Sequence, residues 1–185
     1  VKKFMKKGKI LFTHFGLSGP LILNSAKTVA DLLHTGIVTA TIDAFPDTDL
    51  GALEKRIINV FDINKNKMLK NVFDQIAPEG TSFAILSLVS VDPDKKVHSV
   101  TKEERKEIVQ ILKSLPVNIS GLMGFDRAVV ADGGVSLDEI DTKTMRSKLY
   151  NNLYITGDLL HIKRPSGGYS LQLCWSTGYV AGDNA

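Results

Sequence analysis

The sequence predicts an α+β protein, because strand patterns near both ends of the chain enclose a long block of helical periodicity. Residues 38–42 alternate apolar and polar side chains, as a strand with one buried face does. Residues 47–115 instead place apolar side chains three and four positions apart, the spacing of helices with one buried face. The 185 residues, 43% apolar and 23% charged, suffice for a packed core and exclude a disordered or fibrous chain.

The first predicted part, residues 1–46, begins with a strand and a glycine-rich turn. Residues 8–13 have the composition of a short strand, and two glycines and a proline follow within the next seven residues. We expect a helix to start there, with Ser18 as its N-cap and Pro20 in its first turn. The strand at 38–42 then completes a strand–helix–strand order.

The second predicted part is a helical subdomain over residues 47–116. Apolar side chains at helical spacing predict helices at 50–61 and 68–76. The last helix of this part has the clearest start, because Thr101 and Glu104 have the spacing of a capping box. These apolar stripes have the form of ordinary core faces, so we assign them no chemistry.

The third and fourth predicted parts are residues 117–150, where the β-containing part resumes, and residues 151–185. Strand patterns return at 117–119 and 128–131, and the pair Gly133-Gly134 predicts a turn. No repeat and no low-complexity linker separates these parts.

The last part contains the arrangement most suggestive of chemistry. A short apolar run at 153–155 predicts a buried strand that leads into Gly157 and Asp158, and a carboxylate at the carboxyl edge of a sheet is placed to bind a ligand. Gly167-Gly168 then precedes a predicted helix at 169–181. Paired glycines admit a ligand to the backbone, and the helix N-terminus suits an anionic or electron-rich group such as the edge of a flavin. The alternative is that both are common structural turns.

Three blocks of sequence accompany this arrangement. They are Leu-Phe-Thr-His-Phe-Gly-Leu-Ser-Gly-Pro at 11–20, Gly-Gly-Val at 133–135 with the stretch 144–149, and three segments near the end: 153–158, 165–172 and 176–182. Together, and in this order, they resemble the YhiN-type, aminoacetone-oxidase-like (BaiN-like) family of FAD-dependent flavoproteins. The resemblance covers nearly the whole chain but only the middle and C-terminal portion of such a protein.

The resemblance implies an inserted β-barrel-like domain with a helical subdomain, followed by the C-terminal strand and helix of a Rossmann-like FAD-binding domain. It implies that Gly157 and Asp158 lie against the ribityl and pyrophosphate part of FAD. The isoalloxazine edge would lie against the second glycine turn and the start of the last helix. The predicted cofactor-binding residues are therefore Gly157, Asp158, Gly167, Gly168, Tyr169, Ser170 and Leu171.

The chain departs from the family pattern at four places. It has no Gly-x-Gly-x-x-Gly fingerprint after a strand, so the N-terminal dinucleotide-binding half is absent from it. Asp158 stands where the family usually has Glu, and Ser170 where it usually has Asn. Arg146 occupies a usually acidic position, and the basic stretch 161–164 replaces acidic residues and glycine. This loop favours an anionic substrate if it faces one, and the alternative is a solvated surface loop.

We therefore predict a portion of a cytoplasmic FAD-dependent oxidoreductase in which flavin mediates hydride or electron transfer. Its expected partners are FAD and a small-molecule substrate. A net charge of only +3 and the absence of a long apolar run favour neither nucleic acid nor a membrane. The alternative is a non-catalytic folded domain or interaction module, because this chain alone is expected to hold FAD weakly or not at all and to be inactive.

No catalytic acid or base is identified among the remaining polar residues. His14 lies in the first block, where it either approaches a flavin or bonds to the backbone of its turn. The other histidines are scattered without ligand spacing, so no metal site is expected. The single cysteine, Cys174, is predicted to be a buried structural thiol of the last helix, and it excludes an intrachain disulfide.

Overall fold

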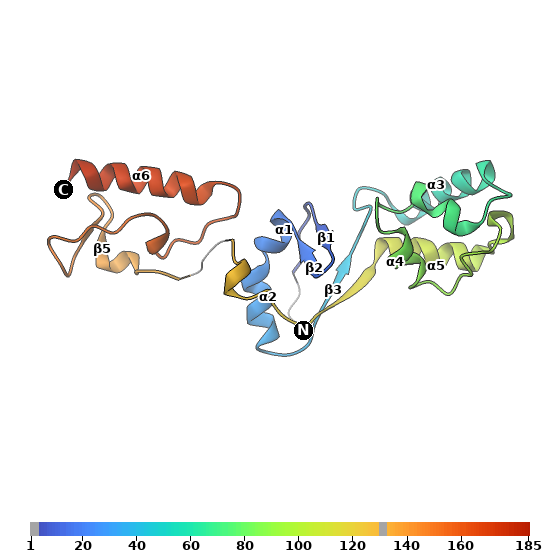
Figure 1. Ribbon diagram of the computed structural model, residues 1–185, viewed down its shortest axis with the longest axis horizontal. Coiled ribbons are helices and arrows are strands. Elements are labelled where there is room, and N and C mark those ends of the chain that lie inside the picture. The colour runs from blue at the N-terminus through green and yellow to red at the C-terminus, as the bar shows by residue number, and fades with distance from the viewer. Residues whose placement is uncertain (1–3, 130–132) are drawn as a thin grey trace. The chain divides into compact units, whose positions relative to one another are not determined.

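The computed structural model describes residues 4–129 and 133–185 of the chain, and it divides into two compact units (Figure 1). Unit 1 consists of Val1–Gly36 and Gly121–Ala185, and unit 2 of Ile37–Ser120. The predicted helical residues 47–116 all fall within unit 2.

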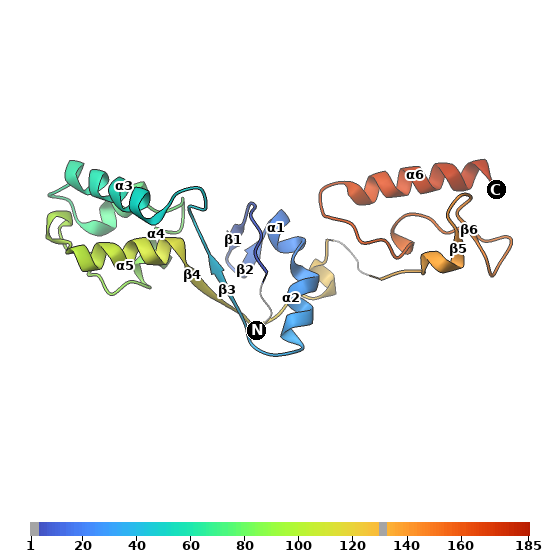
Figure 2. The same cartoon turned by 180° about the vertical axis from the view of Figure 1, so that it is seen from behind.

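Unit 2 combines one strand pair with a helical body. Strand β3 (Val38–Ile42) pairs antiparallel with β4 (Leu115–Ile119), so the two ends of the unit meet. Helix α3 (Leu50–Ile63) lies alongside α5 (Lys102–Lys113) in both views (Figures 1 and 2). The short helix α4 (Ser82–Leu86) and three 3₁₀ turns connect them: η1 (Leu69–Asn71), η2 (Phe73–Gln75) and η3 (Val97–Ser99).

A contiguous apolar core holds unit 2 together. Each helix and turn contributes side chains that are almost completely withdrawn from water, which is the main source of folding free energy for such a body. The fully buried members include Leu53, Ile57, Leu69, Val72, Phe73, Ile76, Ile108 and Leu112. The apolar stripes predicted from helical spacing are therefore core faces.

The sequence predicted the ends of unit 2's long helices better than the connection between them. The capping box of Thr101 and Glu104 is present at the start of α5, as expected. The helix predicted at 68–76 is instead the pair of 3₁₀ turns η1 and η2. The backbone N–H groups of Leu69 and Lys70 donate to carbonyls at 95 and 93, and these tertiary bonds replace the start of a regular helix.

The first part of unit 1 contains a β-hairpin that the sequence did not predict. Strand β1 (Leu11–Thr13) pairs antiparallel with β2 (Gly16–Ser18) across a tight turn. Helix α1 (Pro20–Leu23) begins with Pro20 as expected, but its N-cap is Gly19, so the prediction of Ser18 as the cap is wrong. Ser18 belongs to β2 because the turn closes earlier than the glycine spacing indicated.

The helix predicted after this turn is divided in two. Helix α1 ends before Asn24, and α2 (Ala26–Leu33) follows after Ser25. The Ser25 hydroxyl donates to the carbonyl of Leu21 at 2.7 Å, a local bond that competes with regular helical pairing. A 3₁₀ turn, η4 (Phe125–Arg127), lies where unit 1 resumes.

The C-terminal part of unit 1 has a small core under one long helix. Helix α6 (Tyr169–Asp183), drawn in red, confirms the helix predicted at 169–181 and runs along the preceding segment in both views (Figures 1 and 2). That segment contains η5 (Leu137–Glu139), the strand pair β5 (Ile140–Asp141) and β6 (Arg146–Ser147), and η6 (Gly157–Leu159). The small core between this segment and α6 contains the buried apolar side chains Ile140, Met145, Leu160 and Ala181.

Two predicted strands differ from the structure. Residues 153–155 form no regular strand: Tyr154 makes one isolated bridge with Arg146, and Leu153 is 42% exposed. Without a continuous neighbouring strand among the described residues, this extended segment cannot form a ladder. The strand predicted at 128–131 lies partly outside the described residues, and residues 128 and 129 are not in a strand.

The described strands form three sheets of two strands each and no closed barrel. A barrel requires every edge strand to pair with another, and these strands are only two to five residues long. The Rossmann-like arrangement is likewise not present as a sheet in residues 4–129 and 133–185. Gly133 and Gly134, predicted as a turn, have positive φ but are not assigned to a turn, and they lead into a parallel bridge between Val135 and Leu160. Among the described residues, no helix has the length and apolar character needed to span a membrane.

Candidate functional site

The seven predicted cofactor-binding residues lie in one short region of unit 1. Gly157 and Asp158 belong to η6, Gly167 and Gly168 end the following loop, and the other three residues form the first turn of α6. Contacts between η6 and α6 bring these segments together although the loop separates them in sequence. Within them the glycines have two different roles.

Gly157 is an internal packing residue. It is buried with a φ of 61°, and its N–H donates to the Thr177 hydroxyl of α6 at 2.9 Å. A Cβ atom at this position would lie 2.7 Å from the sulfur of Cys174. Glycine is therefore required here so that η6 can approach α6, and the residue faces the helix rather than open space.

Gly167 and Gly168 are open to their surroundings. Their φ values are 104° and 90°, and a Cβ atom at either position would meet nothing within 4 Å. Gly168 is the N-cap of α6, and no side chain caps this helix. The first N–H groups of α6 therefore have no capping side chain, and the positive end of the helix dipole adds to their attraction for an electron-rich group.

The polar side chains near this turn are organised by Arg164. Asp158 has a half-exposed carboxylate, and its Oδ1 lies 2.8 Å from Nη2 of Arg164. The Nε of Arg164 donates to the Ser170 hydroxyl at 2.8 Å. The side chain of Arg164 is only 5% exposed, although His161, Lys163 and Pro165 of the same loop are exposed. Sequence reasoning identified Asp158 and Ser170 but missed the arginine that joins them.

A pocket of about 340 Å³ adjoins this region. It lies between the loop at 162–165 and α6, and it combines apolar walls with the exposed side chain of Lys163. Of the predicted cofactor-binding residues it includes Tyr169. Its lining residues are Ile162, Lys163, Arg164, Pro165, Tyr169, Gln172, Leu173 and Ser176.

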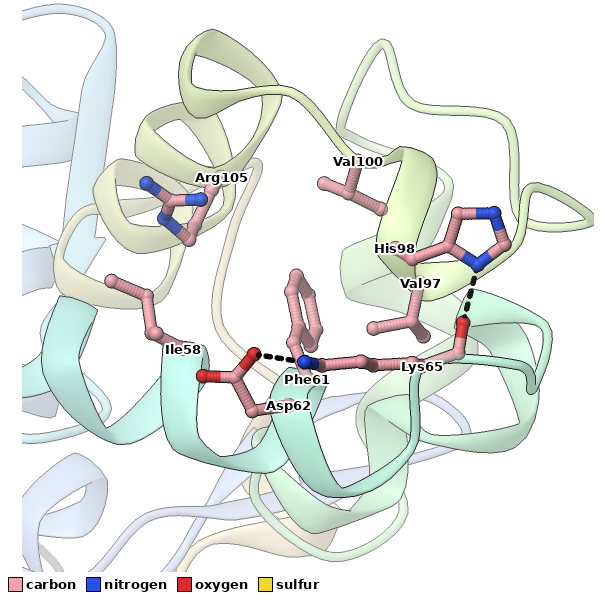
Figure 3. A pocket seen from close by; sticks show the side chains of 8 residues that line it. All are labelled: Ile58, Phe61, Asp62, Lys65, Val97, His98, Val100 and Arg105. Atoms are coloured by element: carbon pink, nitrogen blue, oxygen red, sulfur yellow. Dashed lines mark hydrogen bonds and ion pairs between the residues drawn. The ribbon is translucent and has the colours of Figure 1, made fainter.

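A second pocket, of about 330 Å³, belongs to unit 2 (Figure 3). Phe61 and Lys65 of the α3 region lie on one side of it, and His98 and Arg105 on the other. Its charged groups already have partners within the unit: Lys65 lies 3.4 Å from Asp62, and Arg105 donates to Glu54 at 3.2 Å. His98 Nδ1 lies 2.8 Å from the Lys65 carbonyl. These pairings favour a structural surface cleft over a binding site.

The remaining candidates do not assemble into a catalytic centre in the described part of the chain. His14 stacks edge-on against Phe15, with 4.7 Å between ring centroids, and the guanidinium of Arg127 lies over the Phe15 ring. Cys174 is exposed, so its prediction as a buried thiol is wrong; it lies on the side of α6 that meets Gly157. Within the described ranges, no group of three or more potential ligands could hold a metal ion.

Comparison with known proteins identifies the class of protein to which this architecture belongs. The family model described as "HI0933-like protein barrel and H2TH domain" matches residues 1–130. The chain therefore belongs to the HI0933-like family, which is the family of YhiN- and BaiN-type flavoproteins, and the resemblance stated from the sequence is confirmed. The description names a barrel, whereas the described strands among the matched residues form two-stranded pairs.

Curated relatives include redox enzymes with different substrates. The chain is 26% identical over 176 residues to a 3-dehydro-bile acid delta(4,6)-reductase of Clostridium scindens, covering 95% of the chain and 43% of that protein. It is 27% identical over 171 residues to a ribosomal RNA dihydrouridine synthase of Escherichia coli, covering 92% and 40% respectively. A ribosomal RNA dihydrouridine synthase of Haemophilus influenzae is also 27% identical over 172 residues, with coverage of 93% and 41%. The chain thus spans less than half the length of these relatives.

Proposed function

We propose that this chain is the middle and C-terminal part of an FAD-dependent oxidoreductase, and that its C-terminal region contacts the flavin. The observation that carries the proposal is the open turn at Gly167 and Gly168, which leads into a long helix without a side-chain cap. Such a turn admits a planar, electron-rich group to the backbone, and family membership points to FAD as that group. When bound, the flavin would supply the hydride or electron transfer.

The residues available to FAD are those of the second glycine turn and the start of α6. We propose that Gly167 and Gly168 admit the isoalloxazine edge, and that Tyr169, Ser170 and Leu171 offer backbone N–H groups to it. Asp158 would accept hydrogen bonds from ribityl hydroxyls through its half-exposed carboxylate. Gly157 would act indirectly, by letting η6 pack on α6 so that Asp158 is held in place.

The proposed domain organisation follows the sequence-based division. We propose that residues 1–46 and 117–150 contribute to an inserted β-containing domain, that residues 47–116 form its helical subdomain, and that residues 151–185 complete a Rossmann-like FAD-binding domain. The ADP half of FAD would be held by residues outside this chain, since no Gly-x-Gly-x-x-Gly fingerprint lies within it. A cytoplasmic location remains part of this proposal.

The names of these relatives indicate a shared type of reaction. A delta(4,6)-reductase and a dihydrouridine synthase both add hydrogen across carbon–carbon double bonds, so we propose reduction of such a bond as the reaction type. We retain a small molecule as the proposed substrate. The relatives named for ribosomal RNA make RNA the competing substrate, and comparing flavin reoxidation by a bile-acid dienone and by unmodified ribosomal RNA separates the two.

Flavin absorbance is the direct test of the proposal. We expect the complete protein containing this chain to purify yellow and to keep its flavin through gel filtration, and the 185-residue chain to hold it weakly or not at all. A colourless complete protein that stays colourless after incubation with FAD would overturn the flavin proposal. It would favour the alternative, a non-catalytic domain or interaction module.

A glycine substitution tests the site itself. Gly168→Val in the complete protein should abolish flavin binding, because the added side chain occupies the open space beside the backbone. The matched control is Gly80→Val in unit 2, since Gly80 also has positive φ and open space around it. The control variant should keep its flavin absorbance, and circular dichroism should show unit 2 folded in the Gly168 variant. Retained flavin in Gly168→Val would contradict the proposed backbone approach.

A further inference from the structure

Arg164 is a buried cation that connects three segments of the C-terminal region. Its Nε donates to the Ser170 hydroxyl and its Nη1 to the Ile162 carbonyl, both at 2.8 Å. Its Nη2 is buried without a hydrogen bond and forms an ion pair with Oδ1 of Asp158 at 2.8 Å. The guanidinium thus joins η6, the loop and the first turn of α6.

The side chain of Arg164 is more deeply buried than those of the other arginines of the chain. Its side chain is 5% exposed, compared with 19% for Arg105, which pairs with Glu54 in unit 2. Arginine is rarely buried to this extent unless its charge and its donors are matched, because removing a guanidinium from water is costly. The carboxylate of Asp158 supplies the matching charge, and the planar fork of the guanidinium suits contacts in three directions.

We propose that Arg164 is a positioning residue of the flavin site, an inference that rests on the proposed function. It fixes the Gly167-Gly168 turn relative to Asp158, and it offsets the negative charge of that carboxylate. An uncompensated carboxylate near the flavin would disfavour the reduced cofactor, which gains negative charge on reduction. Arg164 therefore has two separable effects, one on the order of the loop and one on the flavin potential.

Hydrogen exchange in the 185-residue chain tests the effect on the loop without any cofactor. Arg164→Gln removes the charge and most of the donors, so the hydrogen-bonded amides of His161, Ile162 and Gln172 should exchange roughly tenfold faster or more. Arg146→Gln is the matched control, because Arg146 is an exposed arginine of the same unit that lies over the Tyr154 ring. Unchanged exchange in Arg164→Gln would overturn the positioning role.

Flavin binding and potential in the complete protein test the effect on the cofactor. Arg164→Gln should weaken FAD binding roughly tenfold or more and shift the flavin potential to a more negative value, whereas Arg146→Gln should change neither. Arg164→Lys keeps the charge but not the fork, so it should loosen the loop while largely retaining the potential. If Arg164→Gln fails to fold, Arg164→Lys still tests the positioning role.

A double variant separates charge from structure. Asp158→Asn alone should shift the potential to a more positive value, opposite to Arg164→Gln, and the double variant should return close to the wild-type potential although the loop still loosens. A purely structural role of Arg164 predicts shifts of the same sign for both single variants, because each breaks the same ion pair, and that result would overturn the charge component. Wild-type protein that binds no flavin defeats the proposed function and this inference with it. An Arg164→Gln variant that binds flavin as well as the wild-type protein defeats this inference alone.

Discussion

Unit 2 and the C-terminal part of unit 1 bury their apolar side chains to different degrees. The helices α3 and α5 place their apolar stripes in one core, where Leu53, Ile57 and Ile108 are fully buried. In α6 only Thr177 and Ala181 are buried, while Trp175 and Tyr179 are 66% and 71% exposed. Unit 2 thus has the larger buried core, whereas α6 presents an apolar surface of the kind found at binding sites and interfaces.

The difference indicates which substitutions should act on stability and which on the proposed cofactor site. The core of unit 2 accounts for a fold, and its pocket contains charged groups that already have partners. The C-terminal region has a smaller core, but it contains the open glycines and the buried Arg164. Substitutions in unit 2 should therefore act on folding, and substitutions around α6 on local order and cofactor binding.

The largest effect on stability is expected from a substitution in the core of unit 2. Phe73→Ala should lower the free energy of unfolding by about 3–5 kcal/mol, because Phe73 is fully buried and its removal leaves a cavity. Phe83→Ala is the matched control: Phe83 is 87% exposed, and its loss should change stability by less than about 0.5 kcal/mol. Urea unfolding followed by circular dichroism measures both. Equal effects of the two variants would contradict an independent core in unit 2.

The second largest effect is expected from a substitution that disturbs the contact between η6 and α6. Gly157→Ala forces alanine into a left-handed conformation, at a cost of about 1–2 kcal/mol, and brings its Cβ within 2.7 Å of the Cys174 sulfur. The amide at 157, which is bonded to Thr177, should lose hydrogen-exchange protection. Adding Cys174→Ala removes the sulfur and should restore part of that protection. If the double variant exchanges as fast as the single one, the close approach is not the cause.

The sequence correctly predicted the elements whose patterns lie within a short stretch of residues. Helical spacing located α3 and α5, the Gly167-Gly168 turn marked the start of α6, and the spacing of Thr101 and Glu104 located the capping box. The stretch 68–76 was mispredicted because backbone bonds to residues 93 and 95 decide its conformation, and these are not visible in its own spacing. The hairpin of β1 and β2 was missed because its turn is shorter than the glycine spacing indicated.

The candidate site shows the same limit. Paired glycines before a helix identified Gly167 and Gly168, whose positive φ values the structure gives directly. Gly157 was also identified, but its need for glycine comes from Cys174, which is 17 positions away. Arg164 was placed in a basic loop, because its burial depends on Asp158 and Ser170 meeting it in space. Contacts of this kind require the fold.

The third expected effect concerns the start of α5, within the region that has the larger core. Thr101→Ala removes the side chain that accepts a hydrogen bond from the Glu104 N–H, and it should cost about 1 kcal/mol. Thr101→Ser keeps a hydroxyl and should retain most of that stability. Urea unfolding of both variants measures the difference. If serine is as destabilising as alanine, the methyl group of Thr101 matters more than its cap.

The smallest expected effect is a pH dependence of the same capping region. The pKa of Glu104 is lowered from its ordinary value of 4.5, chiefly because Lys95 donates hydrogen bonds to it and also because the Thr101 N–H does so. A carboxylate whose pKa is lower in the folded state stabilises that state fully above its unfolded pKa, and this contribution disappears as the pH falls through the folded pKa.

Glu104→Gln should therefore destabilise unit 2 at neutral pH, and this effect should disappear as the pH falls below 4.5 and through the lower folded pKa of Glu104. The Lys95 and Glu104 side chains are 28% and 22% exposed, so the difference at neutral pH should stay below about 1 kcal/mol. Glu103→Gln, at the neighbouring position in the first turn of α5, serves as the control for loss of charge near the helix dipole. If the two glutamine variants follow the same pH profile, the dipole rather than the Lys95 contact stabilises Glu104.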